Sequence, residues 1–458
     1  MFKNVDELRK FLAGKVEIKG DEVVIADEGA LKAAARELME NSVLNENSDV
    51  RDAVRWVVRE AAQALGIIPS SINDLYMSRG RKEYSGMSVP AINIRGFTFD
   101  VSKALFTACR NKKCPAAVFE IAKSEMEYTF QRPAEYTVSI LAAAIEEGYR
   151  GPVFIQGDHF QFKAKKYFEN KEAEVASTKK LIKEAIDGGY LNIDIDSSTL
   201  VVLERPTLEE QQKDNAEMAA MMTNYIREIE PKGVTVSVGG EIGEVGEKNS
   251  TVEELEAYMT MYGKFVKSGV TGLSKVSVQT GTAHGGVVLP DGSIADVNID
   301  FDTLKKLSNA AIDKWGMGGA VQHGASTLPD SAFDKFPQMD TVEVHLATGF
   351  QNILLDSPDW PAALKDKMYG WMRENLQSDW KKGWTDEQFF AKIRKKAWGP
   401  FKKEVLDIPE ATRAKLRKQL QDKFEFFFDK LGTTNSAKLV SEKVKPVKVK
   451  VPKPACLG

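Results

Sequence analysis

The chain contains very little cysteine and histidine for its length. Of its 458 residues only three are cysteine (Cys109, Cys114 and Cys456) and only four are histidine. Three scattered cysteines are too few for a disulfide framework or a zinc ribbon, which need several cysteines at short, regular spacings. We therefore expect reduced thiols, a fold stabilised by its apolar core and a cytoplasmic location.

Long apolar runs and an excess of one charge are also missing. No run reaches the ~20 apolar residues that a membrane-spanning helix needs. The amphipathic start MFKNVDELRKFL has no apolar signal-peptide core. The net charge of −3 is unlike that of most nucleic-acid-binding proteins. These absences predict a protein whose partners are neither membranes nor nucleic acids.

The helical segments at both ends differ from the middle of the chain. Residues 1–85 are predicted to be a helical N-terminal extension, because Val50, Val54, Val57 and Ala61 recur at helical spacing. Residues 356–435, rich in tryptophan and lysine, are predicted to be a helical C-terminal extension. Residues 436–458 alternate lysine and valine around three prolines, so we expect an extended or disordered tail.

Residues 86–355 alternate short β-rich runs with longer amphipathic helical stretches. This alternation predicts an α/β fold with a parallel sheet. Eight such units at this length fit a (β/α)8 TIM barrel, with a doubly wound open sheet as the alternative. The eight strand candidates are residues 89–94, 116–122, 152–160, 191–198, 234–243, 273–286, 319–326 and 341–349.

All four histidines fall on predicted strands of this barrel, whose active sites lie at the carboxyl ends of the strands. His159, His284 and His323 come at the ends of strands 3, 6 and 7, and His345 lies on strand 8. A single histidine is usually structural, but three at one mouth favour a metal centre. Zn²⁺ takes nitrogen and oxygen donors and keeps an open position in catalytic sites. A polar mouth of hydrogen-bonded histidines is the alternative.

The neighbours Asp158 and His159 pose a geometric problem. Adjacent side chains on a regular strand point to opposite faces. Both can face the mouth only if the strand has ended and the backbone bends there, which Gly157 would help.

Four motifs in this order resemble the class II, metal-dependent fructose- and tagatose-bisphosphate aldolases: GDH (157–159), EIGEVGE (241–247), GTAHGG (281–286) and HGAS (323–326). The resemblance covers residues 89–355. It implies a zinc enzyme that cleaves or forms a ketose (bis)phosphate such as fructose 1,6-bisphosphate, giving dihydroxyacetone phosphate and an aldehyde. It also implies a place in carbohydrate metabolism such as glycolysis, and a homo-oligomer, a dimer or tetramer.

The resemblance further implies roles for individual residues. Asp158 matches the aspartate that handles the hydroxyl proton, and Glu247 is the candidate acid of the loop after strand 5. A second divalent or a monovalent cation beside the zinc is left open. The implied metal ligands are His159, His284 and His323, with Glu241 and Asp196 at an alternative or structural metal position. The implied substrate-binding positions are Asn93, Gly285, Gly324, Ser326 and Thr348.

Strand 8 departs from the family pattern, which usually reads Asn-x-Asp-Thr. Here the residues are His345-Leu346-Ala347-Thr348. This change alters the phosphate pocket and keeps a second hypothesis open, a non-catalytic or accessory sugar-phosphate-binding subunit. A Schiff-base aldolase using Lys275 or Lys123 is the third hypothesis.

Overall fold

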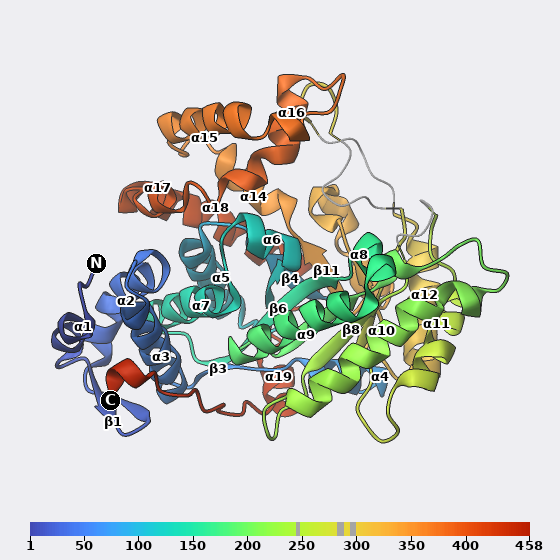
Figure 1. Cartoon of the computed structure of the whole chain (residues 1–458), viewed down its shortest axis with the longest axis horizontal. Coiled ribbons are helices and arrows are strands. Elements are labelled where there is room, and N and C mark those ends of the chain that lie inside the picture. Colours follow the sequence, from blue (N-terminus) through green and yellow to red (C-terminus); the bar gives the residue numbers. More distant parts are fainter. Residues whose placement is uncertain (244–247, 282–287, 294–298) are drawn as a thin grey trace.

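The computed structural model of the chain describes residues 1–243, 248–281, 288–293 and 299–458 (Figure 1). Three positions of the sequence predictions, Glu247, His284 and Gly285, lie outside these residues. No helix in the described ranges has the length and apolarity needed to cross a membrane.

The centre of the molecule is a closed barrel of parallel strands, as the sequence predicts. Neighbouring strands pair in the order β6-β5-β4-β11-β10-β9-β8-β7, and pairing between β6 and β7 closes the ring. The open-sheet alternative is therefore wrong. The barrel strands are β4 (Val89–Asn93), β5 (Val118–Ala122), β6 (Gly151–Gln161), β7 (Asn192–Asp196), β8 (Ser237–Glu241), β9 (Lys275–Val278), β10 (Ala320–Gln322) and β11 (Glu343–Leu346).

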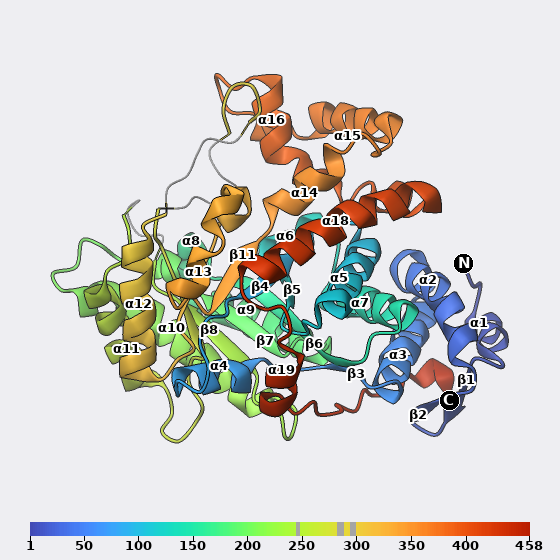
Figure 2. The same cartoon turned by 180° about the vertical axis from the view of Figure 1, so that it is seen from behind.

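Helices follow the strands and cover the outside of the barrel (Figures 1 and 2). Several begin with a side chain that accepts a hydrogen bond from a free backbone N–H; Thr207, for example, caps α10 in a capping box with Glu210. The helices around the barrel are α5 (Thr98–Lys112), α6 (Lys123–Tyr128), α7 (Pro133–Glu147), α8 (Ala164–Glu169), α9 (Lys171–Asp187), α10 (Leu208–Ile229), α11 (Val252–Phe265), α12 (Phe301–Trp315), α13 (Lys335–Gln338) and α14 (Thr348–Leu355).

The N-terminal segment is mainly helical but also contains strands. A short antiparallel hairpin of β1 and β2 follows the first helix, and β3 adds to the start of β6. Its last helix, α4, lies at the ends where the barrel strands begin, since the N–H of Ile72 just before it donates to Asn192 at the start of β7. The elements are α1 (Val5–Leu12), β1 (Val16–Lys19), β2 (Glu22–Ile25), α2 (Glu28–Leu44), α3 (Ser48–Ala64), β3 (Ile67–Pro69) and α4 (Asn73–Gly80).

Helices α15 to α18 lie over the barrel, α19 packs against α4 at its other end, and the tail returns to the N-terminal segment (Figure 2). Helix α18 packs on α5 and α14. The extended tail runs along α3, where Trp56 Nε1 donates to the carbonyl of Val451 and Gln63 Nε2 to that of Val449, both at 3.1 Å. These helices are α15 (Ala362–Asn375), α16 (Asp386–Ile393), α17 (Lys402–Leu406), α18 (Glu410–Lys430) and α19 (Ala437–Lys443).

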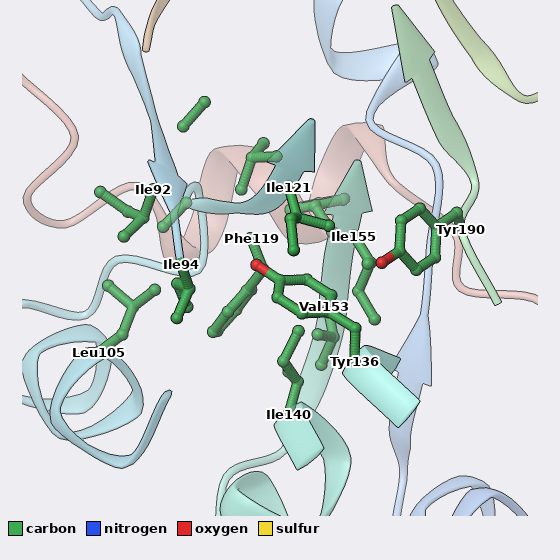
Figure 3. Close-up of a cluster of buried hydrophobic side chains, with 14 of the residues drawn as sticks. Ile92, Ile94, Leu105, Phe119, Ile121, Tyr136, Ile140, Val153, Ile155 and Tyr190 are labelled. Atoms are coloured by element: carbon green, nitrogen blue, oxygen red, sulfur yellow. The ribbon is translucent and has the colours of Figure 1, made fainter. Parts of the chain in front are cut away.

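The apolar core between the barrel and its helices sets the direction of the strand side chains (Figure 3). Phe119 and Ile121 of β5 pack into this core with Ile140 of α7, and all three are buried. Burying each such side chain stabilises the fold by about 1.5–3 kcal/mol. Because strand residues alternate, Glu120 between them points into the barrel.

A layer of buried charges fills the barrel interior below the mouth. Lys275, with a side chain only 1% exposed, donates to Asp194 at 2.9 Å, to Gln156 at 2.7 Å and to Glu343. Tyr76 of α4, at the end of the barrel away from the mouth, donates a hydrogen bond to the other carboxylate oxygen of Glu343. Lys275 thus compensates the negative charges of two buried carboxylates.

We predict that Lys275→Met destabilises the chain by about 3–5 kcal/mol, because it leaves two buried carboxylates without their cation. Urea denaturation followed by circular dichroism measures this loss. Lys267→Met is the control: Lys267 pairs with Glu228 at the surface, where an ion pair contributes about 0–1 kcal/mol. Equal losses in the two variants would contradict the prediction.

Candidate active site

A bulge in β6 brings Asp158 and His159 to the same face. Opposite β7, Gly157 pairs with Ile193 and Phe160 pairs with Ile195, so two residues of β6 stand against one of β7. His159 takes up the extra length with a left-handed backbone, at φ 41°. The strand therefore does not end here, as the sequence suggested, but continues to Gln161.

Glycine is needed at the start of this bulge. A Cβ on Gly157 would lie 2.4 Å from the ring of Phe160, which is fully buried and folds back against it. The sequence predicted that Gly157 helps a bend at the end of the strand; the structure instead shows a close approach to Phe160 inside the strand.

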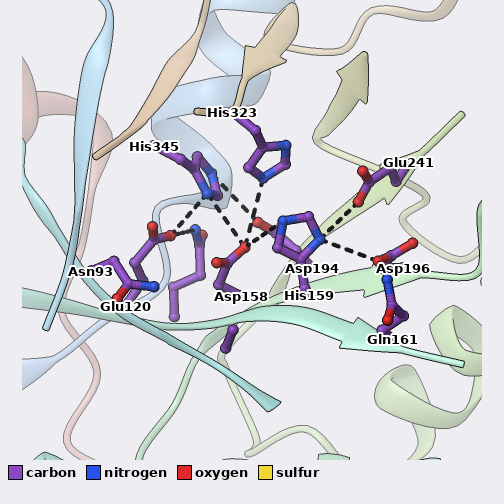
Figure 4. A network of polar contacts seen from close by, with 12 residues as sticks. Asn93, Glu120, Asp158, His159, Gln161, Asp194, Asp196, Glu241, His323 and His345 are labelled. Carbon is purple, nitrogen blue, oxygen red and sulfur yellow. Dashed lines mark hydrogen bonds and ion pairs between the residues drawn. The ribbon is translucent and has the colours of Figure 1, made fainter. Parts of the chain in front are cut away.

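The bulge places Asp158 among three imidazoles (Figure 4). Asp158 Oδ1 lies 3.6 Å from His159 Nε2, 3.7 Å from His323 Nε2 and 3.3 Å from His345 Nδ1. The rings of His159 and His323 are 4.3 Å apart between centroids, and those of His323 and His345 4.2 Å. These side chains come from β6, from the residue after β10 and from β11, so the barrel mouth brings them together.

The other nitrogen of His159 faces two carboxylates at the ends of β7 and β8. Nδ1 lies 3.2 Å from Asp196 Oδ2 and 3.0 Å from Glu241 Oε2. Asp196 is itself held by Gln161, whose amide donates to it at 2.6 Å. Carboxylates in this position fix the orientation of an imidazole that binds a metal with its other nitrogen.

The charges in the site are strongly coupled. Burial raises the pKa of Asp158, but His159, His323 and His345 outweigh it and hold that pKa well below its usual range. Burial, His345 and His159 lower the pKa of His323. Burial and the nearby charge of Asp196 raise the pKa of Glu241 to about 7. Asp158 is therefore ionised beside a neutral His323.

These side chains fit a divalent cation. The donor atoms of Asp158, His159 and His323 lie within 4.8 Å of one another, and so do those of His159, Asp196 and Glu241. Asp158 Oδ1 is buried and makes no hydrogen bond to any of the described residues. Neutral imidazole with carboxylate oxygen is a donor set that Zn²⁺ and similar ions accept. His159 belongs to both groups, so it could bind an ion at either of the two positions.

A cavity of about 320 Å³ opens directly above this cluster. It is formed at the carboxyl ends of the strands and is bounded on one side by α16 and the turn after it. Of the residues predicted to contact metal or substrate, those on its walls are Asn93, Asp158, His159, Asp196, Glu241, His323, Gly324, Ser326 and Thr348.

The sequence-based predictions did not place two residues, His345 and Glu120, at the centre of the site. His345 was placed on strand 8 without a function, yet it contacts Asp158 and lies 3.1 Å from Glu120 and 2.6 Å from Glu343. Glu120 is 1% exposed. The signal was a lone carboxylate in the apolar run AAVFEIA, since an unpaired buried charge is costly and needs partners.

We predict that His323→Ala weakens metal binding by more than about 100-fold, because even an outer-shell partner of a metal ligand contributes about 10–100-fold. Metal content after dialysis, measured by atomic emission, tests this. Glu228→Gln, far from the cavity in an exposed ion pair, is the control and should keep its metal. Full metal content in His323→Ala would show that this imidazole is not a ligand.

Three solved structures resemble this chain at low sequence identity. Among solved structures, a probable tagatose 6-phosphate kinase from Sinorhizobium meliloti 1021 is 17% identical, with a TM-score of 0.51; the match covers 80% of this chain and 96% of that one. A fructose-bisphosphate aldolase from Campylobacter jejuni is also 17% identical, with a TM-score of 0.46, over 81% of this chain and 96% of that one. A fructuronate-tagaturonate epimerase from Cohnella laeviribosi is 13% identical, with a TM-score of 0.48, over 95% of this chain and 90% of that one. A search of curated proteins found no match.

The family comparison covers most of the chain. The model described as fructose-bisphosphate aldolase class-II matches residues 81–434. The match therefore includes the C-terminal helices up to α18, beyond the range of residues 89–355 that carries the motifs. The chain belongs to the class II fructose-bisphosphate aldolase family.

Proposed function

We propose that this chain is a zinc-dependent aldolase that cleaves or forms a ketose (bis)phosphate such as fructose 1,6-bisphosphate, giving dihydroxyacetone phosphate and an aldehyde. The observation that carries the proposal is the contact of the Asp158 carboxylate with the ring nitrogens of His159 and His323 at the mouth of a class II aldolase barrel. This contact places a proton acceptor beside the candidate metal ligands.

In this proposal His159 and His323, together with His284, hold the ion, and Asp196 and Glu241 orient His159 or accept a second cation. A divalent cation held by these residues would supply the Lewis acidity that polarises a ketose carbonyl. Zinc as its identity, a homodimer or homotetramer, and a cytoplasmic place in glycolysis or related metabolism belong to the same proposal. They rest on the resemblance of the motifs.

Asp158 carries the proton. It accepts the proton of the hydroxyl group at the carbon–carbon bond that breaks, while the bonding electrons pass towards the carbonyl. In the condensation direction it returns this proton to the new hydroxyl group. The lowered pKa of Asp158 keeps this carboxyl group ionised, which is the form that can accept a proton. Glu247 is proposed as the acid that exchanges the second proton.

The substrate positions surround this centre. Asn93 donates to Glu125 at 2.6 Å, while its carbonyl oxygen makes no hydrogen bond within the described ranges and can accept from a substrate hydroxyl. Ser326 accepts from the N–H of Gly349 at 3.2 Å, which joins the loops after β10 and β11. We propose that Gly285, Gly324, Ser326 and Thr348 hold the phosphate.

Two other functions can be weighed against this one. Ala347, where the family usually has aspartate, favours an accessory sugar-phosphate-binding subunit. A Schiff-base mechanism at Lys275 is disfavoured: burial lowers the pKa of Lys275, but Asp194 and Glu343 outweigh it and raise the pKa, so the amine stays protonated. Lys123 donates to the carbonyl of Gln161 at 2.8 Å and is the remaining candidate amine.

The experiment that tests the proposal combines metal analysis with activity. We expect about one zinc per purified chain and cleavage of one member of a panel of ketose mono- and bisphosphates. A chelator should abolish this cleavage and added zinc should restore it, because the reaction needs a Lewis acid. Bound zinc without cleavage would favour the accessory subunit, and chelator-resistant cleavage trapped by borohydride would favour the Schiff-base mechanism.

We predict that Asp158→Asn lowers kcat by about 100- to 10,000-fold, the usual contribution of a positioned acid or base. The asparagine keeps the shape of the side chain but cannot accept the proton. Steady-state cleavage assays at fixed metal content measure the effect. Asp187→Asn, an exposed partner of Lys183 on α9, is the matched control. A kcat within about threefold of the wild type would remove Asp158 from the mechanism.

A further inference from the structure

His345 is the histidine to which the proposed function assigns no role. Its side chain comes from β11, lines the cavity and is 4% exposed. In Figure 4 its ring, like those of His159 and His323, points at Asp158. One more ring nitrogen therefore faces the place where the candidate metal ligands meet.

The two ring nitrogens of His345 have different surroundings. Nε2 lies 2.6 Å from Glu343 Oε1, and the same oxygen accepts from Lys275. Burial raises the pKa of Glu343, but Lys275 and His345 outweigh it and hold that pKa well below its usual range. An ionised carboxylate can only accept, so Nε2 carries the hydrogen and Nδ1 is left facing Asp158. A carboxylate on the far nitrogen is the usual support of an imidazole that binds a metal.

Nδ1 of His345 has the surroundings of a metal ligand. It is buried and makes no hydrogen bond within the described ranges, and the same holds for Asp158 Oδ1. Asp158 Oδ1 lies 3.3 Å from Nδ1, and Glu120 Oε2 lies 3.1 Å from it. Ligands about 2.0–2.1 Å from a tetrahedral zinc ion lie roughly 3.4 Å from one another. These separations therefore suit donors that surround one ion.

The charges around His345 favour a cation at the same place. Within 4.0 Å of its ring nitrogens lie four buried carboxylates, those of Glu120, Asp158, Asp194 and Glu343. Lys275 pairs with two of them, Asp194 and Glu343. Burial lowers the pKa of His345, but Glu120, Asp158 and Glu343 outweigh it and raise that pKa well above its usual range. A divalent ion at Nδ1 would displace the proton held there and compensate the same carboxylates.

We propose that His345 is a ligand of the divalent ion and binds it through Nδ1, together with His159 and His323. Imidazole nitrogen is a donor that zinc accepts, and zinc can take a fifth ligand, so a substrate oxygen can still bind. The residue that departs from the family pattern on strand 8 then extends the metal site. This inference rests on the proposed function, to whose ligands it adds His345.

The test measures zinc binding apart from catalysis. The full-length chain is stripped with a chelator and titrated with zinc against a fluorescent chelator at constant pH, which gives an apparent Kd. His345→Gln keeps a polar group that can reach Glu343 but removes the Nδ1 donor, and His345→Leu is the second variant. Tyr76→Phe is the matched control, because it removes the hydrogen bond to Glu343 from the other end of the barrel and leaves every candidate donor in place.

We expect the apparent Kd for zinc to rise at least about 100-fold in both His345 variants, since even an outer-shell partner contributes about 10–100-fold, and to change less than about threefold in Tyr76→Phe. X-ray absorption at the zinc edge should count all four histidines of the chain as ligands in the wild type and one fewer in His345→Gln.

Unchanged affinity in a His345 variant that folds like the wild type, or an equal loss in Tyr76→Phe, would overturn the assignment. So would a count of three or fewer imidazoles in the wild type. His345 would then be a charged partner of Glu120 and Asp158 only. If the wild type binds zinc through His345 but cleaves no ketose, the proposed function is overturned and the ligand is supported.

Discussion

The bulge at residues 157–160 of β6 is the constraint on which the site depends. In a regular strand, either Asp158 or His159 would point into the core between barrel and helices, where an unpaired charge is costly. The left-handed backbone of His159 and the missing side chain of Gly157 turn both residues towards the cavity. Bulges concentrate where a strand must aim a side chain at a site.

The buried charges below the mouth support this arrangement from inside. Glu343 contacts both Lys275 and His345, so the orientation of the His345 ring is tied to an ion pair in the barrel interior. His345 in turn contacts Asp158. The carboxylate that we propose as the proton carrier is therefore positioned by two networks, one through the bulge and one through the interior of the barrel.

The barrel was predictable from sequence because strand and helix periodicities differ and all eight alternations are strong. The candidate ligands followed, since the carboxyl ends of parallel strands meet at one mouth. The bulge was not predictable: the sequence predicts a strand over residues 152–160, and only the register of its pairing with β7 shows the extra residue. His345 was missed for a similar reason, because its partners Glu120 and Asp158 come from other strands and are close to it only after the barrel closes.

The C-terminal helices change what the cavity can recognise. In a barrel alone, the mouth would be lined by strand ends and their loops, and here those ends are mainly acidic. Lys392 and Lys395 bring positive charge to the same space, although they belong to the C-terminal helices, well after the last barrel strand in the sequence. The position of these helices over the barrel therefore changes the charge of the space above the histidines.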